Sequence, residues 1–198
     1  MTYPEQQELL QADPLLEWID DHFLRLDPYA FRESSFRQVI SLVSKELGVD
    51  ANGVFVIGSG AIGLSLNPSN AEDGILRAFD DKSDLDLAVI SEMHFEAAWR
   101  DLRHATQPIF AETQIDERIR ENLNWQKKRL FEGAIVAHRL LPTLSFGNDW
   151  NLSLIRVGNV VAQMLNIERQ LNLWIYRDYW SLRNYVAKSI VRCRQGMV

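Results

Sequence analysis

Cysteine is almost absent from this chain, which has 198 residues and a single cysteine, Cys193. One thiol cannot form an intramolecular disulfide, and it cannot supply the set of cysteine ligands that a zinc site needs. Structural disulfides persist mainly in oxidising compartments, so this composition is typical of the reducing cytoplasm. The sequence therefore predicts a cytoplasmic protein.

The chain also lacks a long apolar run and an excess of positive charge. No stretch approaches the roughly 20 apolar residues of a membrane-spanning helix, and residues 1–5 lack the basic and apolar segments of a signal peptide. We therefore expect no membrane partner. With 21 Lys and Arg against 27 Asp and Glu, the formal net charge is −6. This balance disfavours a protein that coats duplex nucleic acid, but it is compatible with a small basic pocket for the phosphates of a nucleotide.

What is present is the composition of a folded domain, with 46% hydrophobic and 24% charged residues. We find no repeat, low-complexity tract or linker, so the sequence predicts one domain over residues 1–198. Residues 5–47 have helical spacing of apolar positions, with a helix start at Asp27 and Pro28 and a stop at Gly48. The predicted organisation is an N-terminal helical region (1–48) followed by the core and a C-terminal helix (49–198).

The remainder mixes strands with helices. Short apolar or alternating runs predict strands at 54–57, 84–90 and 170–176. Helical periodicity predicts helices over 92–105, 116–140 and 178–194, whereas 147–165 fits either a helix or a strand-turn-helix. Residues 67–83 read as a loop with one helical turn near 75–79. The predicted fold class is α+β, a small mixed sheet flanked by helices.

A glycine-serine pair and two aspartates mark the candidate site. Gly58 and Ser59 directly follow the first strand, where glycine lets the backbone approach a ligand and amides at a helix start attract phosphate. Asp84 and Asp86 are two apart on the second strand, so both carboxylates project to one side, about 6–7 Å apart. Two such carboxylates repel each other unless a cation lies between them. Oxygen ligands of this kind suit magnesium that also takes substrate phosphates.

These residues resemble the signature of the polymerase β-like nucleotidyltransferase superfamily. Val56-Ile57-Gly58-Ser59 followed by Ser83-Asp84-Leu85-Asp86-Leu87 is similar to its hydrophobic strand, Gly-Ser pair and Asp-x-Asp motif, and the likeness covers residues 53–91. The resemblance implies that Asp84 and Asp86 are catalytic and hold Mg²⁺ or Mn²⁺. It further implies that Gly58 and Ser59 bind the phosphates of a nucleoside triphosphate.

The activity implied by this resemblance is transfer of a nucleoside monophosphate to a hydroxyl of a nucleotide, oligonucleotide, protein or small molecule. The resemblance to minimal and bacterial immune nucleotidyltransferases also implies a role in anti-phage defence or a toxin–antitoxin system, with a homo-oligomer or an operon-encoded protein as partner. The phosphates need positive charge, for which the candidates are Lys82, Arg77 and the run Lys127-Lys128-Arg129. Asp80 and Asp81 are weaker candidates for metal or acceptor contact, and Trp174 for base stacking.

The chain departs from the family pattern in two ways. The 25 positions from Ser59 to Asp84 exceed the usual spacer, so an inserted loop is expected beside the site. The family commonly adds a third acidic residue on a later strand, where this chain has Asn172; Asn151 is the other asparagine in a comparable setting, and Glu168 and Asp149 are the nearest carboxylates. Either the strand register differs, or a carboxylate comes from elsewhere, or the protein binds nucleotides or a partner without turnover.

Overall fold

The computed structural model describes residues 3–107 and 117–197, so the start of the predicted helix at residue 116 lies outside the described residues. Its centre is a mixed sheet of four strands in the order β1-β2-β4-β3. The strands are β1 (Val54–Ile57), β2 (Leu85–Ile90), β3 (Ala134–Val136) and β4 (Leu171–Tyr176). β2 pairs antiparallel with β1 and parallel with β4, and β3 pairs antiparallel with β4. The predicted α+β class with a small mixed sheet is confirmed.

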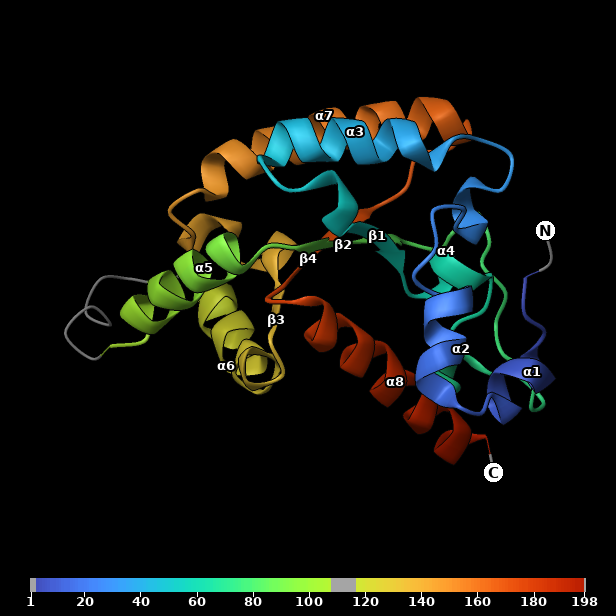
Figure 1. The fold of residues 1–198 in the computed structure, drawn as a ribbon. Helices are drawn as coiled ribbons and strands as arrows, with labels where there is room; N and C mark the ends of the chain where they lie inside the picture. Colours follow the sequence, from blue (N-terminus) through green and yellow to red (C-terminus); the bar gives the residue numbers. More distant parts are fainter. Residues whose placement is uncertain (1–2, 108–116, 198) are drawn as a thin grey trace.

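Helices cover both faces of the sheet. α3 (Phe36–Leu47) and α7 (Gly147–Leu165) lie side by side over one face, and α8 (Tyr179–Gly196) lies along the other (Figure 1). α1 (Gln6–Gln11) and α2 (Leu15–His22) pack against α8. α5 (Glu92–Ala105) and α6 (Glu117–Phe131) lie toward the β3 edge (Figure 1). Because both faces are covered, all four residues of β1 are buried, as its wholly apolar sequence predicts.

The N-terminal prediction is correct for most of α3 but wrong for its start. The predicted apolar stripe is buried, and Gly48 ends the helix in a left-handed conformation with φ 65°. The helix begins at Phe36 after Ser35, however, and Asp27-Pro28 leads only into a short 3₁₀ turn, Tyr29–Phe31. Both Phe31 and Phe36 turn into the core, with ring centroids 5.1 Å apart. The chain bends between them to bury both rings.

Three other expectations are settled by the backbone. The predicted single helix over 116–140 is wrong: α6 ends at Phe131, Gly133 turns the chain with φ 73°, and β3 follows. Residues 147–165 form one helix, α7. The helical turn expected near 75–79 is also wrong, because isolated β-bridges pair Leu64 with Ala78 and Glu72 with Ile75.

The edge strand β3 is completed by a side chain. Gln126 of α6, which is fully buried, donates to the Ala134 carbonyl (2.6 Å) and accepts from the Val136 amide (3.0 Å). These two backbone groups face away from β4, so Gln126 takes the position of a further strand. An exposed sheet edge is a template for aggregation, and here α6 covers it.

We expect Gln126→Leu to destabilise the fold by about 2–4 kcal/mol, because it leaves two buried backbone groups without partners. The free energy of unfolding from urea denaturation tests this value. Gln163→Leu on the exposed face of α7 is the matched control and should change stability little. A Gln126→Leu protein as stable as the control would contradict this role.

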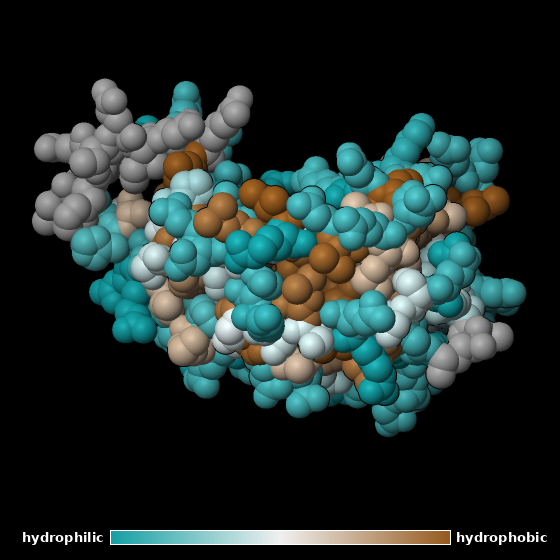
Figure 2. Space-filling model, turned by 90° about the horizontal axis from the view of Figure 1, so that it is seen from above, coloured by the Kyte–Doolittle hydropathy of each residue, from teal (hydrophilic) through white to brown (hydrophobic). Residues whose placement is uncertain are grey.

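The face formed by α3 and α7 carries apolar surface. Figure 2 shows apolar side chains through the middle of this face, bordered by hydrophilic ones. On α7, Leu152 and Ile155 are each more than half exposed.

Within the described part of the chain, no helix combines the length and apolarity needed to cross a membrane.

Candidate functional site

The candidate site lies at one end of the sheet, where β1 ends and both β2 and β4 begin. Gly58 follows the last residue of β1, and Asp84 immediately precedes β2. Asp86, the second residue of β2, pairs with Ile57 on one side and with Asn172 on the other. The antiparallel and parallel pairings together therefore bring the glycine-serine pair and the two aspartates to the same sheet end.

Asp84, Asp86, Gly58 and Ser59 line one cavity of about 530 Å³. The two carboxylates thus face the same side of the sheet, the side covered by α8. Trp174 of β4 lines the same cavity. The other lining residues come from the 65–68 segment and α8, namely Ser65, Leu66, Asn67, Pro68, Tyr185, Val186 and Ser189, together with Phe23, Ile57 and three arginines.

Position 58 requires glycine because of its backbone conformation and because Asp86 lies close to it. Its φ of 67° and ψ of −151° fall in a region that only glycine occupies readily. A Cβ atom at this position would lie 2.8 Å from Oδ2 of Asp86. The absence of a side chain therefore lets the turn after β1 approach the carboxylate directly. Ser59 opens a helix of only four residues, Ser59–Ile62, so its hydroxyl and local amides rather than a helix dipole are available to a phosphate.

We expect Gly58→Ala to lower the free energy of unfolding by about 1–3 kcal/mol because it strains the backbone, and to displace the Asp86 carboxylate. Thermal unfolding and divalent-cation binding measured on the same sample test both effects. Gly74→Ala is the control, since Gly74 also has a positive φ of 77° but has no atom within 4 Å of an added Cβ. If Gly74→Ala loses as much stability and Gly58→Ala keeps its cation affinity, then backbone strain alone matters at Gly58.

Asp86 is partly buried and held by two neutral donors. Nδ2 of Asn172 donates to its Oδ1 at 3.0 Å, and Nε1 of Trp174 donates to the same oxygen at 3.4 Å. Burial raises the pKa of Asp86 above its ordinary value, the two hydrogen bonds oppose the increase, and the charge of Asp84 adds to it. Burial therefore disfavours the charge of this carboxylate, and within the described part of the chain no ion pair offsets it.

The two aspartates have the chemistry of a divalent-cation site. Across residues 3–107 and 117–197, no ion pair reaches Asp84 or Asp86 from a lysine, arginine or histidine. Oδ2 of Asp86 faces the Gly58 turn while Oδ1 takes both donors, and Asp84 is exposed to the cavity. Oxygen ligands of this kind fit Mg²⁺ or Mn²⁺ when substrate phosphates and water complete the coordination shell. In the same described ranges, no group of three or more His, Cys, Asp or Glu side chains could hold a metal.

The positive charge of the cavity comes from arginines. Arg77, Arg129 and Arg192 line it, whereas Lys82 does not. Lys82 is exposed, and its backbone amide donates to the side chain of Asp80 in the preceding turn. Of the run at 127–129, only Arg129 lines the cavity; Lys127 lines a different cavity, between α5 and α6, and Lys128 is exposed. Sequence reasoning singled out Arg77 and Arg129 but missed Arg192, which carries no motif.

Within residues 3–107 and 117–197, no third carboxylate lines the cavity. Glu168 lines a different cavity beside α7, and Asp149 lies in the first turn of α7, on the opposite face of the sheet (Figure 1). Asn151 is likewise on α7 and lines the same cavity as Glu168. The register of β4 places Asn172 directly opposite Asp86. The expected third position is therefore occupied by an amide.

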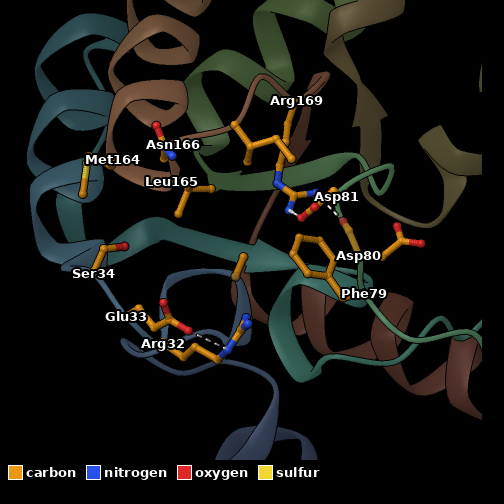
Figure 3. A pocket seen from close by; sticks show the side chains of 12 residues that line it. Arg32, Glu33, Ser34, Phe79, Asp80, Asp81, Met164, Leu165, Asn166 and Arg169 are labelled. Carbon is orange, nitrogen blue, oxygen red and sulfur yellow. Dashed lines mark hydrogen bonds and ion pairs between the residues drawn. The ribbon is translucent and has the colours of Figure 1, made fainter.

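Asp80 and Asp81 line another cavity, of about 470 Å³. Figure 3 shows Arg169 reaching from the segment before β4 toward Asp81, with Phe79 beside it. The Arg169 guanidinium lies 4.5 Å from the centre of the Phe79 ring and donates to the carbonyls of Asp80 and Ser83. Arg169 thus fixes the turn that leads into Asp84. No local pattern in the sequence predicts this contact, which spans more than 80 residues.

Comparison with protein families, with curated proteins and with solved structures found no match to this chain.

Proposed function

We propose that the protein binds a nucleoside triphosphate with a divalent cation in the cavity beside β2 and transfers its nucleotidyl group to a hydroxyl acceptor. The observation that carries the proposal is the meeting of two unpaired carboxylates, Asp84 and Asp86, with the Gly58-Ser59 turn in one cavity. The volume of about 530 Å³ is within the range of small-molecule sites.

The charges of the cavity suit a ligand that is both anionic and metal-bound. Two carboxylates attract a cation, while three arginines across the cavity attract phosphate. Mg²⁺ or Mn²⁺ bound by Asp84 and Asp86 would supply charge stabilisation at the α-phosphate. Ser59 can donate its hydroxyl to a terminal phosphate, and Trp174 presents an aromatic ring for the base.

In the proposed reaction, the acceptor oxygen bonds to the α-phosphorus and the bond to the β-phosphate oxygen breaks, which releases pyrophosphate. The hydroxyl proton must leave as the new bond forms. Of the described residues that line the cavity, only Asp84 and Asp86 are carboxylates. Since both are assigned to the cation, proton loss to water is the simplest route, and turnover should be slow.

A second candidate function is nucleotide binding without turnover. The observation that favours it is Asn172, which donates to Asp86 where a further carboxylate would extend the cation site. Such a protein would sense nucleotides or act on a partner in a nucleotide-dependent manner.

Incubation with each of the four ribonucleoside triphosphates and Mg²⁺ or Mn²⁺, followed by measurement of pyrophosphate release, separates the two functions. Turnover that is lost in Asp84→Ala and Asp86→Ala proteins of unchanged fold supports the transferase. Cation-dependent binding without pyrophosphate release supports the binding module. If neither turnover nor cation-dependent binding occurs with any of the nucleotides, both assignments are wrong.

A further inference from the structure

Three arginines from separate parts of the chain converge on the cavity. Arg77 lies on the loop between β1 and β2, Arg129 on α6, and Arg192 on α8. On α8, Tyr185, Ser189 and Arg192 are spaced at i, i+4 and i+7, so one helix face presents them all to the cavity. The loop position of Arg77 is anchored, because its carbonyl accepts from the amide of Ser65 at 2.8 Å.

None of these arginines forms an ion pair with a carboxylate of the described residues. Nε of Arg129 is buried, and no described residue supplies it with a hydrogen-bond acceptor. Burial lowers the pKa of Arg129; Tyr185 and Glu132 oppose this decrease, and the charges of Arg139 and Arg192 add to it. An anion bound in the cavity would therefore favour the charged guanidinium.

Arg129 is held in place before any ligand arrives. Its guanidinium lies 3.0 Å from the centre of the Trp125 ring, and Nη1 donates to the Trp125 carbonyl at 3.0 Å. A stacked guanidinium loses less conformational freedom on binding than a mobile lysine would. The cavity therefore contains at least one preorganised phosphate donor.

We propose that Arg77, Arg129 and Arg192 form a polyphosphate-binding subsite that holds its ligand without a divalent cation. The ligand class is a chain of two or more phosphates, either inorganic or the tail of a nucleotide. Its identification with the nucleotide tail rests on the function proposed above. The binding of an inorganic phosphate chain does not rest on that function, because it requires only the three arginines.

The charges support cation-free binding. Without metal, the cavity carries three arginines against two aspartates, so its net charge is positive. Arginine pairs with phosphate oxygens through two parallel hydrogen bonds, and a chain of phosphates can engage several guanidinium groups at once. A single phosphate offers fewer oxygens than a phosphate chain to guanidinium groups on three separate elements. Removal of the two carboxylates should strengthen binding by removing like-charge repulsion of the ligand.

Calorimetric titration of the whole protein with sodium tripolyphosphate in EDTA tests the subsite. We expect binding that weakens at least about 10-fold in each of Arg129→Gln and Arg192→Gln, consistent with loss of one charge-assisted contact. Arg37→Gln, which removes an exposed arginine from α3, is the matched control and should bind like the parent protein. The Asp84→Asn, Asp86→Asn double variant should bind tripolyphosphate as tightly as the parent or more tightly. Adenosine triphosphate should compete, and adenosine monophosphate should not.

The outcomes separate this inference from the proposed function. If tripolyphosphate binds in EDTA and the arginine variants lose it while no nucleotide is turned over, the subsite stands and the transferase fails. If nucleotide binds only with a divalent cation and tripolyphosphate does not bind in EDTA, the subsite is wrong although the proposed function stands. Equal binding by Arg37→Gln, Arg129→Gln and Arg192→Gln would also overturn the subsite. Tighter binding of a single-stranded oligonucleotide than of tripolyphosphate would also overturn the subsite.

Discussion

Asp86→Asn is expected to stabilise the ligand-free protein and at the same time to abolish its cation-dependent nucleotide binding. Asp86 is partly buried beside Asp84 without a cationic partner, and both burial and that neighbouring charge raise its pKa. Asparagine removes the charge but keeps an oxygen that can accept from Asn172 and Trp174. Cation affinity should fall at least about 100-fold, because even the loss of an outer-shell partner commonly costs 10–100-fold.

The pH dependence of stability tests the same carboxylate. The folded state holds the Asp86 proton more tightly than the unfolded chain, whose aspartates titrate near 3.8. The contribution of Asp86 to the free energy of unfolding therefore falls as pH rises from 3.8 through the folded pKa, and the penalty is fully present above it. Subtracting the urea-unfolding profile of Asp86→Asn from that of the parent protein should reveal this slope.

Asp21→Asn, at an exposed position of α2, is the control for loss of one negative charge. Its free energy of unfolding should vary with pH in parallel with that of the parent protein. Mg²⁺ should raise the melting temperature of the parent and of Asp21→Asn but not of Asp86→Asn. An Asp86→Asn protein that melts earlier than the parent without metal, and still responds to Mg²⁺, would contradict the interpretation of Asp86 as an unpaired cation ligand.

Asn172→Asp should make the site more dependent on a cation. The new carboxylate would lie opposite Asp86, whose Oδ1 now accepts from Asn172 at 3.0 Å. A hydrogen bond would be replaced by repulsion between like charges. We therefore expect the free energy of unfolding of the metal-free protein to fall by about 1–3 kcal/mol. Mn²⁺ should restore most of that stability, and its affinity should rise at least about 10-fold, because a third oxygen ligand is added.

The control is Asn124→Asp, which adds a negative charge at an exposed position of α6. Mn²⁺ affinity measured by calorimetry should increase only in Asn172→Asp. If pyrophosphate release also appears only in that variant, the parent protein is the binding module. Unchanged Mn²⁺ affinity would show that Asn172 does not face the cation.

The sequence predicted those parts of the fold whose local pattern matched their tertiary setting. β1 and the apolar stripe of α3 were predicted because burial on both faces, or on one stripe, leaves a direct mark on the apolar spacing. Strand geometry predicts that Asp84 and Asp86 face one side, and the phosphate-binding chemistry of Gly58-Ser59 together with the family resemblance predicts that this pair joins them; the structure places all four in one cavity. Their chemical roles stay a prediction.

Features that depend on distant contacts were not predicted. β3 was hidden inside a predicted helix because its three residues are too few to show a period, and its outer edge is completed by Gln126. Lys82 was chosen for its position in the loop, whereas Arg192 reaches the cavity only because α8 crosses below the sheet (Figure 1). The contacts of Arg169 with the 80–83 turn likewise depend on the order of β2 and β4 in the sheet.

The most direct test is a crystal soaked with Mn²⁺ and a non-hydrolysable nucleoside triphosphate, with the metal located by anomalous scattering. A manganese peak bridging Asp84 and Asp86, with the triphosphate running from the Gly58 turn toward Arg129 and Arg192, is the predicted result. A metal bound at Asp80 and Asp81, or a nucleotide bound outside this cavity, would contradict it.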